Sequence, residues 1–176
     1  SGKSTLAAEL LQALDRRAPC EAALLPMDGF HLDNAALEPR GLLARKGTPE
    51  TFDFDGYRAA LDRVRSGGSV AVPVFDRQLD LARAGAALIG PEHRVVVSEG
   101  NYLLLDRDPW REVAEMFDVT LFLSVSEQEL HSRLVQRWRD HGLSEASAVA
   151  RAEGNDLANA RLITRWRRPS DYDWVQ

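Results

Sequence analysis

Short apolar runs with no alternation of polar and apolar residues constrain this fold more than any other feature. Residues 94–98 contain three consecutive valines, and residues 22–27 form a second run of this kind. A strand reads this way when both of its faces are buried, as in a parallel sheet covered by helices on each side. The two runs therefore predict buried strands within an α/β fold.

Amphipathic helical patterns alternate with these runs. Leucines recur every four residues from Leu6 to Leu14, which predicts a helix that begins just after Ser4 and Thr5. Strands that alternate with helices predict a doubly wound parallel sheet, whose ligands bind beyond the carboxyl ends of the strands. Further helical patterns cover residues 55–66, residues 127–138 after a capping box of Ser126 and Glu129, and residues 144–168 with a break near Gly154; further strand-like runs cover residues 70–75 (an edge strand or extended loop), 118–124 and 171–176.

Composition narrows the class of protein. The 176 residues are 44% hydrophobic and 28% charged, which is typical of one globular domain, here residues 1–176. A net charge of −5 argues against a nucleic-acid binder or an anionic-membrane binder. The single cysteine, Cys20, excludes an intrachain disulfide and a cysteine-based zinc site, and no apolar run approaches about 18 residues. We therefore expect a cytoplasmic protein without membrane insertion, and a homodimer is left open.

The first residues match the second half of a phosphate-binding loop. The full motif is G-x-x-x-x-G-K-[ST], in which backbone N–H groups and the lysine hold phosphates and the hydroxyl ligates Mg²⁺. Ser1, Gly2, Lys3, Ser4 and Thr5 therefore predict ATP binding, with Ser4 as a metal ligand; the alternative is a capped helix N-terminus with a surface lysine. A parallel sheet around this loop needs the strand that feeds it, so we expect that Ser1 is not the natural start.

Two predicted strands end in carboxylates. Asp28 follows the run at residues 22–27, and Glu99 follows the run at residues 94–98. Phosphoryl transfer needs the donor phosphates and metal held and the acceptor hydroxyl oriented. Asp28 is therefore a candidate catalytic base and Glu99 a candidate magnesium ligand, direct or through water, although an acid at a strand end also serves as a helix cap.

Other side chains are candidates for contact with the reacting groups. Lys3 is also placed among the catalytic candidates, because an ammonium there would reach the transferred phosphate. Arg133 and Arg137 lie four residues apart on one predicted helical face, the spacing at which two guanidinium groups close over a phosphate as a lid around residues 130–145. The alternative for this pair is a solvated face. His31 follows Asp28 by three residues and predicts a substrate contact, with a structural histidine as the alternative.

With these residues in place, the chain resembles the P-loop kinases that include uridine kinases, phosphoribulokinases and type I pantothenate kinases. Beyond the opening residues, the resemblance rests on residues 27–31 (MDGFH), 45–53 (RKGTPETFD), 73–77 (PVFDR) and 99–102 (EGNY). It implies a three-layer α/β/α P-loop nucleoside triphosphate hydrolase fold with a helical lid, Asp28 as base, Glu99 at magnesium, and an acceptor pocket lined by the segments around His31, Phe52, Arg77, Asn101 and Tyr102. Asn155, Asp156 and Asn159 also match the family, without a role that chemistry assigns.

Departures from the family bear on the substrate. Residues 75–79 (FDRQL) lack the histidine of pantothenate kinases, and residues 78–82 lack the histidine and arginine of uridine kinases. The segment EGNYLLL resembles bacterial uridine-kinase-like proteins associated by name with sugar transport, including fructose. We therefore expect an ATP- and Mg²⁺-dependent kinase that acts on a hydroxyl of a small polar metabolite, with a sugar preferred. The alternatives are a pantothenate or nucleoside kinase and a non-catalytic ATP-binding regulator linked to sugar transport.

Overall fold

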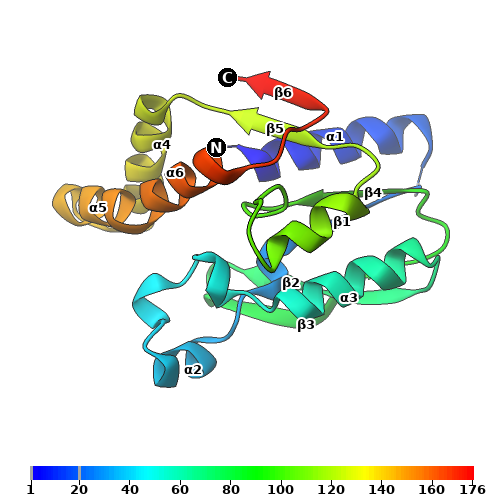
Figure 1. The fold of residues 1–176 in the computed structure, drawn as a ribbon, viewed down its shortest axis with the longest axis horizontal. Helices are drawn as coiled ribbons and strands as arrows, with labels where there is room; N and C mark the ends of the chain where they lie inside the picture. Colours follow the sequence, from blue (N-terminus) through cyan, green and yellow to red (C-terminus); the bar gives the residue numbers. More distant parts are fainter. Residues whose placement is uncertain (1, 20) are drawn as a thin grey trace. The chain divides into compact units, whose positions relative to one another are not determined.

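A computed structural model describes residues 2–19 and 21–176 of the chain (Figure 1). Ser1, which was predicted to bind phosphate, and Cys20 lie outside the described residues. The chain forms two compact units that meet in sequence between Leu103 and Leu104.

The first unit, Gly2–Leu103, holds both predicted buried strands and the helix between the opening motif and the first of them. The helix begins at Lys3, slightly earlier than predicted, because Gly2 has already adopted the left-handed N-cap conformation. Its elements are α1 (Lys3–Arg17), β1 (Ala22–Pro26), η1 (Met27–Phe30), α2 (Asn34–Leu37), the short 3-10 turns η2 (Glu38–Arg40), η3 (Leu43–Arg45) and η4 (Pro49–Thr51), α3 (Phe54–Arg65), β2 (Val70–Asp76), β3 (Leu81–Ile89) and β4 (Val95–Glu99).

Strands β1 and β4 pair in parallel, which confirms the predicted α/β class with parallel strands. The register places Ala22 opposite Val95 and Pro26 opposite Glu99. Helix α1 packs along both strands and covers them. The sequence predicted a strand buried on both faces at β4, but Val95, the first residue of that strand, is 43% exposed. The carboxyl ends of the two strands nevertheless reach the same edge, as the prediction required.

Strands β2 and β3 form an antiparallel hairpin that extends along α3 (Figure 1). The register shifts between Val72 and Val74, so the irregularity surrounds Pro73, a residue that cannot donate to a ladder. Strand β3 was not predicted from the sequence. Its run LARAGAALI is rich in alanine and has little of the β-branched or aromatic content that marks strands.

The segment between β1 and α3 is built from short turns around a buried threonine, Thr51. The Thr51 hydroxyl accepts a hydrogen bond from the Gly47 N–H at 2.9 Å and donates one to the Thr48 carbonyl at 2.8 Å. Leu37 and Phe52 from this segment are buried.

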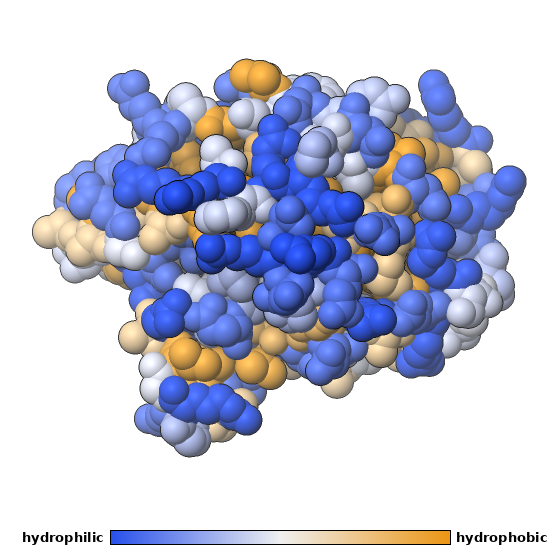
Figure 2. All heavy atoms as spheres, in the orientation of Figure 1, coloured by the Kyte–Doolittle hydropathy of each residue, from blue (hydrophilic) through white to orange (hydrophobic). Residues whose placement is uncertain are grey.

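Polar side chains cover most of the face that Figure 2 shows, and apolar side chains gather beside α2.

The second unit begins at Leu104 and contains a parallel strand pair and several helical segments. Ser126 caps its first long helix by accepting from the Glu129 N–H at 3.2 Å, so this part of the capping box is confirmed. The break predicted near Gly154 is a π-helical segment between two α-helices. The elements are η5 (Trp110–Met116), β5 (Leu121–Ser124), α4 (Glu127–Asp140), α5 (Glu145–Arg151), η6 (Ala152–Asp156), α6 (Leu157–Trp166) and β6 (Tyr172–Val175).

A small apolar core holds α4, α5 and α6 together. It contains Leu134, Val135, Ala148, Ala152 and Leu157, against which the partly buried Leu130 and Trp138 pack. Across the described part of the chain, no helix combines the length and the apolar character that crossing a membrane requires.

Candidate active site

Two acids lie at the carboxyl ends of the paired strands β1 and β4, and a glycine follows each. Asp28 is in the turn η1 immediately after β1, while Glu99 is the last residue of β4. A Cβ atom at Gly29 would lie 2.2 Å from the carbonyl oxygen of Pro73 in β2, and one at Gly100 would lie 2.5 Å from the Cβ of Met27. Both glycines therefore permit a backbone approach that any side chain would prevent, and this approach sets the positions of the two acids.

The N-terminus of α1 lies beside Glu99. The Ser4 hydroxyl donates to the Glu99 Oε1 at 3.2 Å, although the two residues are 95 positions apart in the sequence. Gly2 precedes the helix with a φ of 86°, in the left-handed region that favours glycine. Among the described residues, the Lys3 ammonium has no hydrogen-bonded partner. The helix end thus offers unpaired N–H groups, a hydroxyl and a cation, which together suit a phosphate.

The surroundings of Glu99 disfavour the charged form of its carboxyl group. Burial raises the pKa of its carboxyl above the ordinary value, and the negative charge of Asp28 adds to this effect. Lys3, the Ser4 hydroxyl and Arg77 favour the ionised form, but the net pKa shift is upward. Carboxylate and hydroxyl oxygens are hard ligands of the kind that Mg²⁺ prefers. Glu99 and Ser4 therefore fit a magnesium ion, whose charge would stabilise the carboxylate that burial disfavours.

Asp28 makes two different contacts with neighbouring side chains. Its carboxylate Oδ2 accepts from an Arg77 N–H at 3.3 Å, in an ion pair where the arginine side chain is 57% exposed. Its backbone oxygen lies 2.7 Å from Nδ1 of His31. Because a carbonyl oxygen only accepts, Nδ1 of His31 carries a proton, and in the neutral ring Nε2 bears the lone pair.

His31 stands between two aromatic rings. Its ring centroid is 4.1 Å from that of Phe52 and 4.6 Å from that of Phe75. Burial lowers the pKa of His31 below its ordinary value, and the hydrogen bond and charge of Asp28 only partly oppose this. The imidazole is therefore neutral near pH 7. It forms an aromatic wall beside Asp28.

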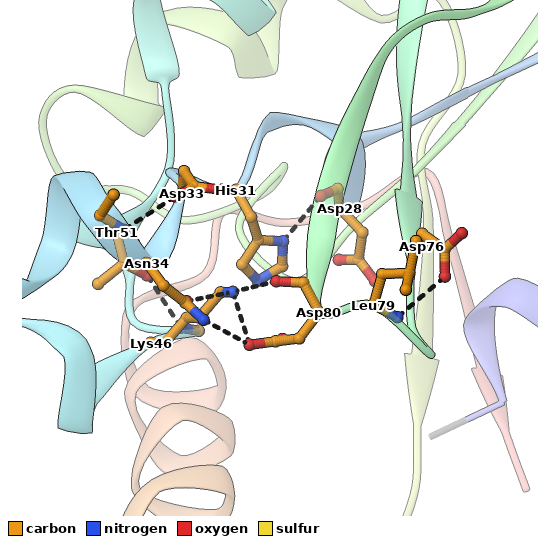
Figure 3. A network of polar contacts seen from close by, with 11 residues as sticks. Asp28, His31, Asp33, Asn34, Lys46, Thr51, Asp76, Leu79 and Asp80 are labelled. Atoms are coloured by element: carbon orange, nitrogen blue, oxygen red, sulfur yellow. Dashed lines mark hydrogen bonds and ion pairs between the residues drawn. The ribbon is translucent and has the colours of Figure 1, made fainter.

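Lys46 is a residue of this region for which the sequence predicted no role. Its ammonium donates to the Asn34 Oδ1 at 2.7 Å, to the Asp80 carbonyl at 2.7 Å and to the Asp80 Oδ2 at 2.9 Å (Figure 3). It also lies 5.3 Å from the centroid of the Phe75 ring. A signal was present in the sequence, because Lys3 and Lys46 are the only lysines among 22 basic residues.

The two remaining residues predicted for the acceptor pocket follow β4. Tyr102 is fully buried, its hydroxyl donates to the Gly47 carbonyl at 2.6 Å, and its ring meets that of Phe52 edge-on at 5.7 Å. Asn101 is exposed. The structure thus brings Lys3, Ser4, Asp28 and Glu99 to one edge of the strands. Arg77 and His31 contact Asp28, and the ring of Tyr102 packs against that of Phe52.

The predicted lid arginines both have partners within the second unit. Arg133 donates to Glu129 at 2.7 Å and to the side-chain oxygen of Gln176 at 2.7 Å. Arg137 donates to Asp156 at 3.2 Å. Asp156 also accepts from the indole N–H of Trp138 at 2.7 Å, so it ties the π-helical segment to α4. This contact supplies a structural role for one of the three family-like residues that the sequence left unexplained.

A solved structure matches almost the whole chain. It is the crystal structure of a "putative fructose transport system kinase" from Silicibacter sp. TM1040, with 54% sequence identity and a TM-score of 0.93 over 98% of this chain and 84% of that one. A "putative uridine kinase" of Schizosaccharomyces pombe is 30% identical over 174 residues, which are 94% of this chain and 74% of the relative. The chain belongs to the P-loop kinases of the uridine kinase group.

A further relative agrees with this membership. An "ATP-dependent kinase-like protein" of Aspergillus versicolor is 32% identical over 154 residues, which are 81% of this chain and 90% of the relative. No protein-family model matches the chain. Membership of the P-loop kinases confirms the fold class and the resemblance that the sequence motifs predicted.

Proposed function

We propose that this P-loop kinase transfers the γ-phosphoryl group of ATP to a hydroxyl of a small polar metabolite, with a sugar or related compound preferred. The observation that carries the proposal is the contact of Ser4 with Glu99 beside Asp28. It joins a helix N-terminus suited to phosphate with a metal-ligand pair and a candidate base at one edge of the strands.

The donor side of the site would be formed by α1 and β4. Backbone N–H groups around Gly2 and the ammonium of Lys3 would hold the phosphates of ATP, with Ser1 and Thr5 as the remaining members of the predicted loop. Ser4 and Glu99 would hold Mg²⁺, which when bound supplies charge neutralisation for the phosphates. Arg133 and Arg137, on the predicted lid at residues 130–145, would add positive charge over the transferred group.

The acceptor side would be formed around Asp28. Its carboxylate would take the proton of the acceptor hydroxyl as the bond between that oxygen and the γ-phosphorus forms and the bond from the γ-phosphorus to the bridging oxygen of ADP breaks. Arg77 would orient the carboxylate. His31, Phe52, Asn101 and Tyr102 would line or support the pocket, and the neutral His31 Nε2 can accept a hydrogen bond from a second hydroxyl.

Two observations favour a sugar. The 54% identical structure is of a protein named for fructose transport. In addition, residues 75–79 lack the histidine of pantothenate kinases, and residues 78–82 lack the histidine and arginine of uridine kinases. Pantothenate and nucleosides are the alternative acceptors. A regulator that binds ATP without transferring its phosphate is the rival from another class.

The test is ADP release by the full-length protein with ATP and Mg²⁺, in the presence of D-fructose, uridine or pantothenate. We expect acceptor-dependent release, with D-fructose or a related sugar most effective. Asp28→Asn should lower turnover by about 10²- to 10⁴-fold, the usual contribution of a general base, and leave ATP affinity nearly unchanged. Normal turnover of this variant would refute the base assignment. Tight ATP binding without stimulated release would favour the regulator.

A further inference from the structure

The tip of the β2–β3 hairpin has a shape fixed by its own side chains. The Asp76 carboxylate accepts from the backbone N–H groups of Gln78 and Leu79, both at 3.1 Å. Asp80 then adopts a φ of 53°, in the left-handed region that asparagine and aspartate tolerate better than most residues. The tip therefore presents Arg77 to Asp28 at its start and Asp80 to Lys46 at its end.

A buried cation anchors this tip. The side chain of Lys46 is only 9% exposed, and three acceptors match the three protons of its ammonium. Two of these acceptors belong to Asp80, and the third is Asn34 Oδ1. Asn34 itself donates from Nδ2 to the same carboxylate oxygen of Asp80, at 3.1 Å. Oδ2 of Asp80 thus accepts two hydrogen bonds, one from Asn34 and one from Lys46, as Figure 3 shows.

The other oxygen of this carboxylate remains available. Oδ1 of Asp80 has no hydrogen-bonded partner among the described residues, and the side chain is 57% exposed. Burial raises the pKa of Asp80, but the hydrogen bonds from Lys46 and Asn34 outweigh it, so the net shift is downward and the group is ionised. An ionised carboxylate is a pure acceptor of hydrogen bonds. Oδ1 can therefore accept a hydrogen bond from water or from a ligand.

Asp28 presents a matching oxygen. Its Oδ2 pairs with Arg77, whereas its Oδ1 has no such partner among residues 2–19 and 21–176. Figure 3 shows the side chain of His31 beside both Asp28 and Asp80, so the two carboxylates share this neighbourhood. Two acceptor oxygens in the neighbourhood of the His31 ring match a ligand rich in hydroxyl donors. A carboxylate or phosphate of a ligand placed against Asp80 would be repelled.

We propose that Asp80 is an acceptor-binding residue whose Oδ1 accepts a hydrogen bond from a hydroxyl of a neutral polyhydroxy compound, and that Lys46 and Asn34 are positioning residues that aim it. This inference rests on the proposed function. The hydroxyl bound by Asp80 is distinct from the one that reacts at Asp28. The required ligand therefore carries at least two hydroxyl groups.

Binding is tested first, independently of turnover. Isothermal titration calorimetry of the full-length protein with D-fructose, D-ribose and D-mannitol should detect at least one ligand. Asp80→Asn keeps an oxygen and a residue that tolerates the left-handed backbone, but removes the charge; we expect its Kd for that compound to rise about tenfold, as loss of a charge-assisted hydrogen bond predicts. Affinity for ATP should stay within about twofold. Asp62→Asn, at an exposed position of α3, is the matched control and should leave both affinities unchanged.

The positioning role has its own readout. With an amine-acetylating reagent and mass spectrometry, Lys46 should react at least about tenfold more slowly than Lys3, because its nitrogen becomes nucleophilic only after its hydrogen bonds break and it loses a proton. Asp80→Asn should accelerate acetylation of Lys46 and leave Lys3 unchanged. Lys46→Met should raise the Kd for the polyhydroxy compound without changing that for ATP.

Several results would overturn the inference. They are equal acetylation rates of the two lysines in the wild type, a polyol Kd that Asp80→Asn changes by less than about twofold, and no binding of any of the three polyols. In the last case, ADP release with another acceptor would leave the proposed kinase function standing. Conversely, Asp80-dependent polyol binding without ADP release by any acceptor would support the binding residue and refute the kinase.

Discussion

The two lysines of this chain lie in regions that use a cation in opposite ways. At the N-terminus of α1, Lys3 has no hydrogen-bonded partner among the described residues, and Glu99 is the acid that its charge affects. In the turns between β1 and α3, Lys46 donates to Asn34 and twice to Asp80. The first region leaves its ammonium available to a ligand. The second uses its ammonium to shape the protein.

The difference follows from what each side of the proposed site must bind. A triphosphate brings negative charge, so its site works best with cations and N–H groups that the fold has not already paired. An acceptor hydroxyl brings a proton, so its site needs carboxylate oxygens held in place. Lys46 meets that need indirectly, since it fixes one oxygen of Asp80 and leaves the other open. The same residue type therefore serves binding in one region and positioning in the other.

Replacing Lys3 is the strongest way to break this comparison. Lys3→Ala should lower kcat/KM for ATP by about 10²- to 10³-fold, or about 3–4 kcal/mol of transition-state stabilisation, because no other described cation is unpaired at this helix end. The free energy of unfolding should hardly change. Steady-state kinetics and urea denaturation measure the two effects. A large loss of stability with intact ATP kinetics would show that Lys3 is structural.

Lys46 should behave in the opposite way. Lys46→Met keeps the side-chain volume but leaves Asn34 and Asp80 without their donor, so we expect a loss of about 2 kcal/mol in the free energy of unfolding. Arg45→Met is the control, because Arg45 forms an ion pair with Glu50 in which the side chains are 61% and 40% exposed. Its cost should be less than about 1 kcal/mol. Equal costs for the two variants, measured by urea denaturation, would contradict the anchoring role.

The pH dependence of stability tests the role of Glu99 on the donor side. Its pKa is raised by burial, so the folded state holds the proton more tightly than the unfolded state does, and stability falls as the pH rises through the ordinary pKa and then the raised one. Glu99→Gln cannot ionise. Without ligands, the variant should therefore gain stability relative to the wild type between about pH 4 and pH 7, while Mg²⁺-dependent ATP binding weakens. Urea denaturation across this range tests the sign; parallel stability curves would refute it.

The smallest effect concerns His31 on the acceptor side. Its pKa is lowered chiefly by burial, with Asp28 and Asp80 opposing and Lys46 assisting. The neutral ring is favoured in the folded state, so its contribution to stability is present above the ordinary pKa and is lost as the pH falls through the lowered one. NMR titration of the ring should show a pKa below 6.5 that rises in Lys46→Met, because a nearby positive charge is lost. An unchanged pKa of His31 in that variant would show that Lys46 lies too far from the ring in solution to affect it.

Local signals in the sequence predicted much of the fold. The apolar runs gave the positions of β1 and β4, the leucine repeat gave α1, and Ser126 marked the start of α4. Each of these signals depends on neighbours within a few residues, such as side-chain periodicity or a cap. Strand β3 lacked such a signal, because its stability comes from pairing with β2 rather than from the propensity of its alanines.

The candidate site divides in the same way. Lys3, Ser4, Asp28 and Glu99 were predicted because each stands at a helix start or strand end, where parallel topology brings side chains to one edge. The contact of Lys46 with Asp80 joins residues 34 positions apart, and no local pattern announces it. Tyr102 was predicted in the acceptor pocket from family resemblance. The structure places its hydroxyl on the Gly47 carbonyl, and its role in the pocket stays a prediction.

By itself, the sequence determined the class of the fold, the phosphate-binding character of its opening residues and the two acids at the strand ends. These properties are encoded in short stretches, where periodicity and residue type are sufficient. Only the tertiary structure decided which charges are already paired and which remain open. That distinction depends on long-range distances and burial, since a lysine with three acceptors and a lysine with none among the described residues look the same in a sequence.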